Sequence, residues 1–126
     1  MQSNFKDILV VDDEQEIRDL LKEFLEENKF NVVLAADGLK ALELIEKKLP
    51  GLAIVDLLLP GEHGINLVKT IKEKYFIPTI IISSIYRREE LEDFIEEFFV
   101  EGYFEKPINL NELLKKINAI SEARAV

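Results

Sequence analysis

The sequence predicts an α/β protein with a doubly wound parallel sheet of five strands and helices on both faces of the sheet. Short apolar runs of strand length alternate five times with segments whose apolar residues recur at helical spacing. The connections between these segments are short. Because right-handed crossovers join parallel strands, such an alternation places helices on both faces of one parallel sheet.

Five apolar runs supply the expected strands, at residues 8–11, 32–35, 52–56, 79–83 and 103–105. The third run is unbroken and ends in loop-forming residues, a pattern typical of a strand that is buried on both faces. Since all five strands run in one direction, their carboxyl ends share one edge of the sheet. Ligands of open α/β sheets bind at this edge.

Apolar residues at helical spacing follow the first two strands and predict helices that face the sheet. The stripe of the first helix comprises Ile17, Leu20, Leu21, Phe24 and Leu25. The stripe of the second comprises Ala41, Leu42, Ile45 and Leu49. Asn28 is expected to end the first helix and Asp37 to cap the second, which Pro50 and Gly51 then break.

Three more helices follow the remaining strands. The third is expected at about residues 65–74. The fourth has an apolar face of Leu91, Phe94, Ile95, Phe98 and Phe99, and its other face is acidic. The fifth begins at a capping box formed by Asn109 and Glu112, and the chain is expected to fray from residue 121 to 126.

Length and composition indicate one globular domain of residues 1–126 with a core at about residues 6–120. The 16 basic and 25 acidic residues give a net charge of −9, which disfavours direct binding to nucleic acid or to anionic membranes. The absence of cysteine excludes disulfides and thiolate metal sites. No leader-like or membrane-spanning apolar run is found, so a cytoplasmic monomer or dimer is expected.

Polar side chains end four of the five expected strands. Asp12 and Asp13 follow the first, Asp56 ends the third, Ser83 ends the fourth and Lys106 follows the fifth. Two carboxylates about 4 Å apart repel each other by roughly 4 kcal/mol at an effective dielectric constant near 20. Three carboxylates at one edge therefore call for a hard divalent cation, Mg²⁺ or Mn²⁺.

Such a site suits phosphoryl transfer. A strand-end carboxylate such as Asp56 can act as a nucleophile toward a phosphoryl group. The cation and Lys106 can neutralise the phosphoryl oxygens, and Ser83 can donate a hydrogen bond to one of them. The alternative role of Asp56, a cap of the next helix, is disfavoured because Pro60 and Gly61 come before any helical pattern.

Over residues 6–120 the chain resembles the receiver domains of two-component response regulators. The features that carry the resemblance are Asp12-Asp13-Glu14 after the first strand, Asp56 with Pro60 and Gly64 beyond it, Ser83, and Tyr103 before Lys106-Pro107. The resemblance implies a flavodoxin-like receiver fold with strand order 2-1-3-4-5. It also implies that the chain is a phosphoacceptor signalling domain and not an enzyme.

The resemblance implies a role for each matching residue. Asp56 would accept a phosphoryl group from a histidine kinase or a histidine phosphotransferase. Asp13, Asp56 and the backbone carbonyl of Leu58 would bind Mg²⁺ directly, and Asp12 would bind it through water. Ser83 and Lys106 would hold the phosphoryl oxygens.

The resemblance also implies a switch. Tyr103 would turn inward as Ser83 moves toward the phosphoryl group, and a cis peptide bond at Pro107 would aim Lys106. The face made by the fourth helix, fifth strand and fifth helix would signal to a downstream protein or an output domain. Phosphorylation could also drive formation of a homodimer.

The chain departs from the family pattern at two places. Phe98, Phe99 and Val100 stand where receivers usually have a small Gly-Ala pair. They are interpreted as core residues, with an aromatic contact patch as the alternative. Leu58 and Ile85 are apolar at positions that admit or exclude hydrolytic water in receivers, which predicts a slowly hydrolysed acyl phosphate.

Three other functions fit the sequence less well. An aspartyl-phosphate phosphatase would need a second acid two residues after Asp56, where Leu58 stands. A flavodoxin-like cofactor carrier would need a phosphate-binding loop after the first strand, where the sequence is acidic. A pseudo-receiver that only binds proteins is the remaining alternative, disfavoured by the complete set of site residues.

Overall fold

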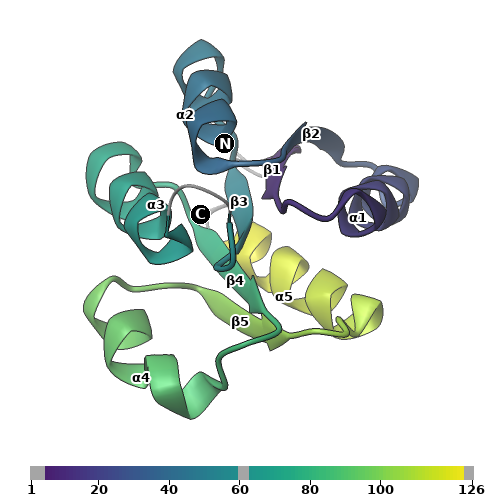
Figure 1. Cartoon of the computed structure of the whole chain (residues 1–126). Helices are drawn as coiled ribbons and strands as arrows, with labels where there is room; N and C mark the ends of the chain where they lie inside the picture. Colours follow the sequence, from purple (N-terminus) through teal and green to yellow (C-terminus); the bar gives the residue numbers. More distant parts are fainter. Residues whose placement is uncertain (1–4, 60–62, 124–126) are drawn as a thin grey trace.

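Five parallel strands form one sheet in the spatial order β2-β1-β3-β4-β5 (Figure 1). The computed structural model of the chain describes residues 5–59 and 63–123. The strands are β1 (Asp7–Val11), β2 (Asn31–Ala35), β3 (Leu52–Asp56), β4 (Thr79–Ser83) and β5 (Gly102–Glu105). The five expected strands and their expected order are confirmed.

Helices cover both faces of this sheet, as Figure 1 shows. They are α1 (Gln15–Glu27), α2 (Gly38–Lys47), α3 (Gly64–Thr70), which continues as a π-helical turn η1 (Ile71–Tyr75), α4 (Arg88–Glu97) and α5 (Leu110–Ala123). α1 and α5 pack on one face, and α2, α3 and α4 pack on the other. Within the described residues, no helix has both the length and the apolar character needed to span a membrane.

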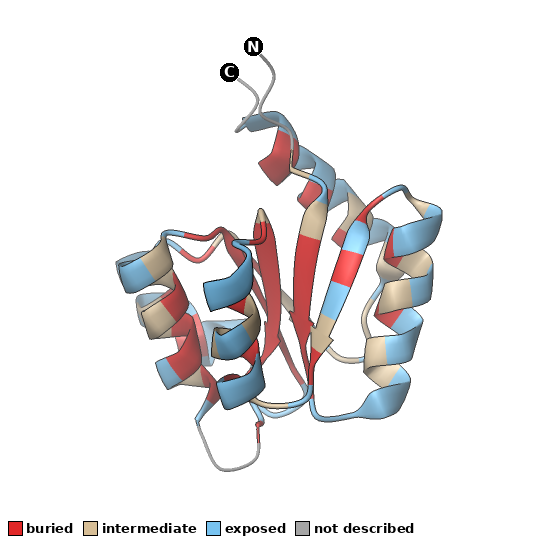
Figure 2. Cartoon of the chain, turned by 90° about the horizontal axis from the view of Figure 1, so that it is seen from above, coloured by how far each residue is buried: buried red, intermediate tan, exposed pale blue. Residues whose placement is uncertain are grey.

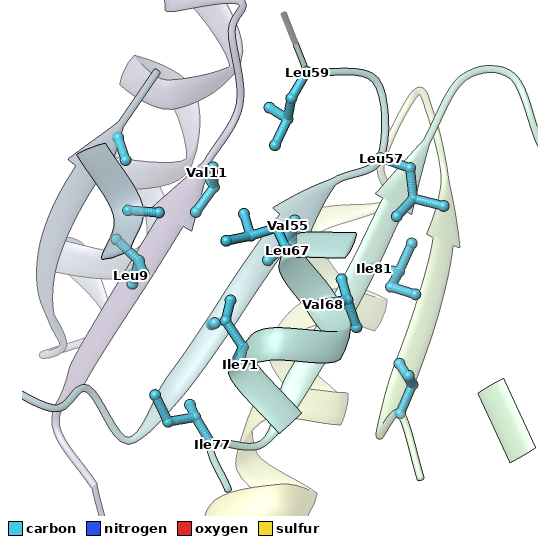
Figure 3. Packing of buried hydrophobic residues seen from close by; sticks show 14 of the residues in the cluster. Leu9, Val11, Val55, Leu57, Leu59, Leu67, Val68, Ile71, Ile77 and Ile81 are labelled. Atoms are coloured by element: carbon cyan, nitrogen blue, oxygen red, sulfur yellow. The ribbon is translucent and has the colours of Figure 1, made fainter. Parts of the chain in front are cut away.

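The core has two halves because neighbouring strand residues point to opposite faces. Leu9 and Val11 of β1 belong to the half under α2, α3 and α4, and Ile8 and Val10 belong to the half under α1 and α5. β3 and β4 are buried along their whole length (Figure 2). Figure 3 shows the first half, where α3 packs on β3 and β4.

The structure corrects three details of the expected helices. Leu49 is exposed, because α2 ends at Lys47 and the backbone of Lys48 is already extended. Leu20 is 45% exposed at the flank of the α1 stripe. α5 continues to Ala123 with Ser121 buried, so the expected fraying is wrong for residues 121–123, and residues 124–126 lie outside the described part of the chain.

The C-terminal end of α4 overturns the interpretation that Phe99 is a core residue. The helix ends in a Schellman motif, in which the Val100 N–H donates to the Ile95 carbonyl and the Phe99 N–H to the Glu96 carbonyl. The motif needs one left-handed residue, and Phe99 takes that conformation with φ 56°. Its side chain is therefore turned to solvent and is 79% exposed, whereas Val100 is buried.

Two other helices also end in a left-handed residue that is not glycine. Lys29 follows α1 with φ 75°, in a motif closed by hydrogen bonds to the Glu26 and Leu25 carbonyls. Phe76 follows η1 with φ 56° and is 76% exposed. A side chain with a Cβ strains the backbone in this conformation, and glycine does not.

We predict that Phe99→Gly raises the free energy of unfolding by about 1 kcal/mol, because glycine adopts the left-handed conformation without strain. Lys29→Gly should give a similar gain. Urea denaturation measures both. Leu20→Gly, which removes a half-exposed side chain inside the right-handed helix α1, should instead lower the stability by about 1 kcal/mol or more. A loss of stability in Phe99→Gly would contradict the prediction.

Candidate functional site

Two buried carboxylates lie at the carboxyl edge of the sheet. Asp56 is the last residue of β3 and is 2% exposed, and Asp12 follows β1 and is fully buried. The backbone N–H of Leu58 donates to Asp56 Oδ1 at 3.1 Å, and that of Glu14 donates to Asp12 Oδ1 at 2.9 Å. Because β1 and β3 are neighbours in the sheet, their ends bring the two carboxylates together.

Lys106 supplies the cation between these carboxylates. It follows β5, and its backbone N–H donates to the Ser83 carbonyl at 2.9 Å, so the end of β4 holds it in place. Its Nζ lies 2.9 Å from Asp12 Oδ2 and 3.1 Å from Asp56 Oδ2. The peptide bond between Lys106 and Pro107 is cis, the form expected from the resemblance.

Glu14 is a third carboxylate on Lys106, and its role was not predicted from the sequence. Its Oε1 lies 2.6 Å from the Lys106 Nζ, and its side chain is 59% exposed. The two residues are 92 positions apart in the chain. The acidic run of Asp12, Asp13 and Glu14 signals that this end of the site is acidic, but only the folded structure pairs Glu14 with Lys106.

The pKa values follow from burial and from this pairing. Burial, with a smaller contribution from the charge of Asp56, raises the pKa of Asp12 to about 6, although the hydrogen bond from the Glu14 backbone and the nearby charge of Lys106 lower it. Burial by itself would lower the pKa of Lys106, but its close contacts with the carboxylates of Glu14, Asp12 and Asp56 outweigh burial and raise it. Lys106 therefore stays protonated and compensates the buried carboxylates.

The donor atoms of this site fit a hard divalent cation. Carboxylate oxygens of Asp12, Asp13, Glu14 and Asp56 all lie within 4.8 Å of one another. Asp12 Oδ2 is buried and, although it lies near Lys106 Nζ, it has no well-aligned hydrogen bond. Asp13 and Glu14 are exposed, so an ion could reach the cluster from solvent. Such an all-oxygen set suits Mg²⁺ or Mn²⁺.

Ser83 and Tyr103 lie next to this edge. Ser83 ends β4, is fully buried, and its Oγ accepts hydrogen bonds from the backbone N–H groups of Ile85 and Tyr86 at 3.1 and 3.0 Å. A hydroxyl that accepts two bonds still has its own proton to donate. The Tyr103 hydroxyl is buried near Ser83 without a well-aligned hydrogen bond, and burial raises its pKa.

Two apolar side chains, Leu58 after β3 and Ile85 after β4, follow the strand ends that carry Asp56 and Ser83. Leu58 is 52% exposed, and Ile85, after β4, is 50% exposed. Gly64 begins α3 against the backbone of this segment, because its N–H donates to the Leu57 carbonyl and a Cβ there would lie 2.4 Å from Leu57 Cα. Pro60 and Gly61, which the sequence also singled out, lie outside the described residues.

We predict that Lys106→Met lowers the free energy of unfolding at pH 7 by about 3 kcal/mol, because it leaves buried carboxylates without a counter-charge. The loss should shrink as the pH falls toward 4. Asp12 already has a raised pKa in the folded protein, so it takes up a proton and its charge disappears. Urea denaturation without divalent ions, at both pH values, measures this.

The matched control is Lys115→Met on α5. Lys115 lies 3.5 Å from Glu112, and its side chain is 80% exposed. Removing this surface pair should change stability by less than about 0.5 kcal/mol. An equal loss in both variants, or a Lys106→Met loss that does not depend on pH, would contradict the buried-charge explanation.

Known proteins share both the sequence pattern and the fold. Residues 8–118 match the family described as "Response regulator receiver domain". The chain is 37% identical over 114 residues to the transcriptional regulatory protein CpxR of Escherichia coli K12, with 90% of this chain and 48% of that protein covered. Response regulator RR06 of Streptococcus pneumoniae D39 is 33% identical over 113 residues, which cover 90% of this chain and 52% of RR06. The chain thus spans about half the length of these curated relatives.

Solved structures show the same fold. A CheY-like response regulator receiver domain protein from Methanospirillum hungatei JF-1 superposes with a TM-score of 0.86 at 30% identity, covering 95% of this chain and 96% of that chain. The receiver domain of the Francisella response regulator 1452 superposes with a TM-score of 0.85 at 28% identity, covering 94% and 98%. On the strength of its sequence, fold and site together, the chain belongs to the response-regulator receiver domain family of two-component signalling.

Proposed function

We propose that this receiver accepts a phosphoryl group on Asp56 from a phosphohistidine of a sensor kinase or a histidine phosphotransferase. The observation that carries the proposal is the buried Asp56 carboxylate at a strand end, with Lys106 Nζ 3.1 Å away and the carboxylate cluster beside it. An aspartate that served only the fold would gain little from such a costly position. We further propose that the domain signals to other proteins and has no catalytic turnover of a separate substrate.

The proposed transfer forms one bond to phosphorus and breaks another. A carboxylate oxygen of Asp56 attacks the phosphorus of the donor, the phosphorus–nitrogen bond breaks, and the electron pair leaves with the donor imidazole. The product is an acyl phosphate on Asp56. Lys106, already protonated beside Asp56, neutralises charge on the phosphoryl oxygens, and the Ser83 hydroxyl donates to one of them.

The carboxylate cluster would hold the metal that this transfer needs. Asp13, Asp56 and the Leu58 carbonyl would bind Mg²⁺ directly, and Asp12 would bind it through water. Mg²⁺, or Mn²⁺ in its place, supplies positive charge that lets an anionic donor approach the acidic edge. Glu14 would add a further negative charge at the exposed side of the site.

The proposed signal leaves the site through Ser83 and Tyr103. A phosphoryl oxygen would draw the Ser83 hydroxyl toward Asp56, and the buried Tyr103 hydroxyl lies next to Ser83. Contacts that exist only in the phosphorylated state shift the balance between two conformations. We propose that the surface formed by α4, β5 and α5 changes on phosphorylation. A downstream protein, an output domain or a second copy of the chain would bind this surface.

We predict that acetyl phosphate with Mg²⁺ adds one phosphoryl group to the protein, measured by intact mass. Asp56→Asn should gain none, because an amide is not a nucleophile toward phosphorus. Omitting Mg²⁺ should also abolish the gain. Asp37→Asn, at the N-cap of α2, is the matched control and should be phosphorylated like the parent protein. No gain with acetyl phosphate or phosphoramidate would favour a pseudo-receiver that only binds proteins.

We also predict that the phosphoryl group is lost slowly, over many minutes to hours. Leu58 and Ile85 are apolar and half exposed beside the site, so they can shield Asp56 but cannot orient an attacking water by a hydrogen bond. The decay of the phosphorylated mass measures the lifetime. Leu58→Asn should shorten it several-fold, and Leu39→Asn, on the exposed face of α2, should not. Loss within a minute in the parent protein would contradict the prediction.

A further inference from the structure

A groove lies between the end of η1 and the end of α4. Its volume is about 540 Å³, and it is lined by Lys72, Glu73, Phe76, Glu97, Phe98 and Phe99. Phe76 comes shortly before β4 begins, and Phe99 shortly before β5 begins. The groove therefore belongs to the edge where strands start, whereas Asp56 lies where a strand ends. At about 3.3 Å per residue, the five-residue strand β4 separates the two edges by roughly 13 Å.

Two of the most exposed aromatic side chains of the described residues line this groove. Phe76 is 76% and Phe99 is 79% exposed, and both have the left-handed backbone conformation that favours glycine. Neither the exposure nor the conformation helps the chain to fold. Phe98 lies between α4 and α3, with its ring 4.9 Å from that of Phe94 and 5.6 Å from Lys69 Nζ. The groove thus has an apolar surface held in place by its neighbours.

The walls of the groove are tied together before anything binds. Lys72 Nζ lies 2.7 and 2.9 Å from the two carboxylate oxygens of Glu101, so η1 is joined to the segment between α4 and β5. Glu101 Oε1 also accepts the Thr79 N–H at 2.8 Å, and the Glu101 N–H donates to the Thr79 carbonyl at 2.9 Å. A preformed site loses little conformational freedom when a ligand binds.

The charged residues that line the groove favour a basic ligand, although Lys69 Nζ lies 5.6 Å from the Phe98 ring. Glu101 neutralises Lys72, whereas no ion pair is found for Glu73 or Glu97 among the described residues. The solvent face of α4 continues the acidic rim with Glu92, Asp93 and Glu96, all exposed. A second copy of the chain would bring an equally acidic rim against this one, and each copy carries a net charge of −9. Like charges disfavour that pairing.

We propose that this groove docks a short basic segment of a partner protein. The segment inserts one large apolar side chain between Phe76 and Phe99 and places lysine or arginine side chains against Glu73 and Glu97. A groove of this volume accommodates one or two large side chains. This docking surface is separate from Asp56 and does not depend on phosphorylation.

The test is a nuclear magnetic resonance titration of the ¹⁵N-labelled 126-residue chain with two synthetic peptides. One has the sequence Lys-Lys-Phe-Leu-Arg-Lys, and the other, Glu-Glu-Phe-Leu-Glu-Glu, has the same apolar centre with reversed charge. The basic peptide should shift the amide signals of residues 72–76 and 97–100, and the acidic peptide should not. Its affinity should fall as salt rises from low to moderate ionic strength.

Phe99→Gly should weaken binding of the basic peptide by about tenfold or more, because it removes a central aromatic contact. This variant keeps its fold, since glycine suits the left-handed position. Lys29→Gly is the matched control: it relieves the same backbone conformation at the end of α1 and should bind like the parent protein.

The double variant Glu73→Gln with Glu97→Gln tests the charges of the groove. It should bind the basic peptide more weakly and with less salt dependence.

Four results would overturn the proposal. They are no shift in the groove at millimolar peptide, equal binding of both peptides, unchanged affinity in Phe99→Gly, and shifts confined to the acidic edge near Asp12 and Asp56. Sedimentation equilibrium of the parent protein and of Phe99→Gly tests whether a second copy of the chain occupies the groove instead. Self-association that Phe99→Gly abolishes would assign the groove to a second copy of the chain instead.

Discussion

The contact of Lys106 with the carboxylates of Asp12, Asp56 and Glu14 is the interaction on which the site depends. Asp12 and Asp56 are almost completely buried, and buried carboxylates without a counter-charge would repel each other and lose the solvation of water. One ammonium group meets this need and also joins the ends of β1, β3 and β5. It therefore keeps the acidic edge compact and negatively charged, with the buried Asp56 next to the exposed Asp13 and Glu14.

The topology of the sheet makes this contact possible. β1 and β3 are neighbours, so their ends supply the two buried carboxylates, and β4 lies between β3 and β5. Ser83 at the end of β4 accepts the backbone N–H of Lys106, which directs the lysine side chain across β4 toward β1 and β3. Most other residues of the sheet are apolar and pack against helices on both faces (Figure 2), and the polar groups of the site collect at the carboxyl edge.

The two edges of the sheet differ in chemistry. The carboxyl edge carries carboxylates and a lysine suited to an anionic group with a metal ion, whereas the opposite edge carries Phe76, Phe98 and Phe99 in a groove with an acidic rim. Two aromatic residues stand where glycine would be more stable, at the ends of η1 and α4. Natural proteins commonly give up stability at surfaces that serve binding.

The local pattern of the sequence was enough to determine the strands, the approximate helices and the set of strand-end residues, because periodicity and strand polarity depend only on near neighbours in the chain. It placed Asp12, Asp56, Ser83 and Lys106 at one edge correctly. It failed where a result depends on the exact residue at which a helix ends. Leu49 and Phe99 are exposed because helices end one or two residues earlier than their apolar stripes suggest.

Only the tertiary structure decided that Glu14 shares Lys106 and that Phe76 and Phe99 face one groove. Residues 14 and 106 come from opposite ends of the chain. Phe76 precedes β4 and Phe99 precedes β5, so β4 and α4 separate the two aromatic residues in the sequence. Such contacts follow from the order of strands in space and from the exact residue at which each helix closes. Neither is encoded in the periodicity of a single segment, because both are set by how buried neighbours such as Ile95 and Val100 pack against the sheet.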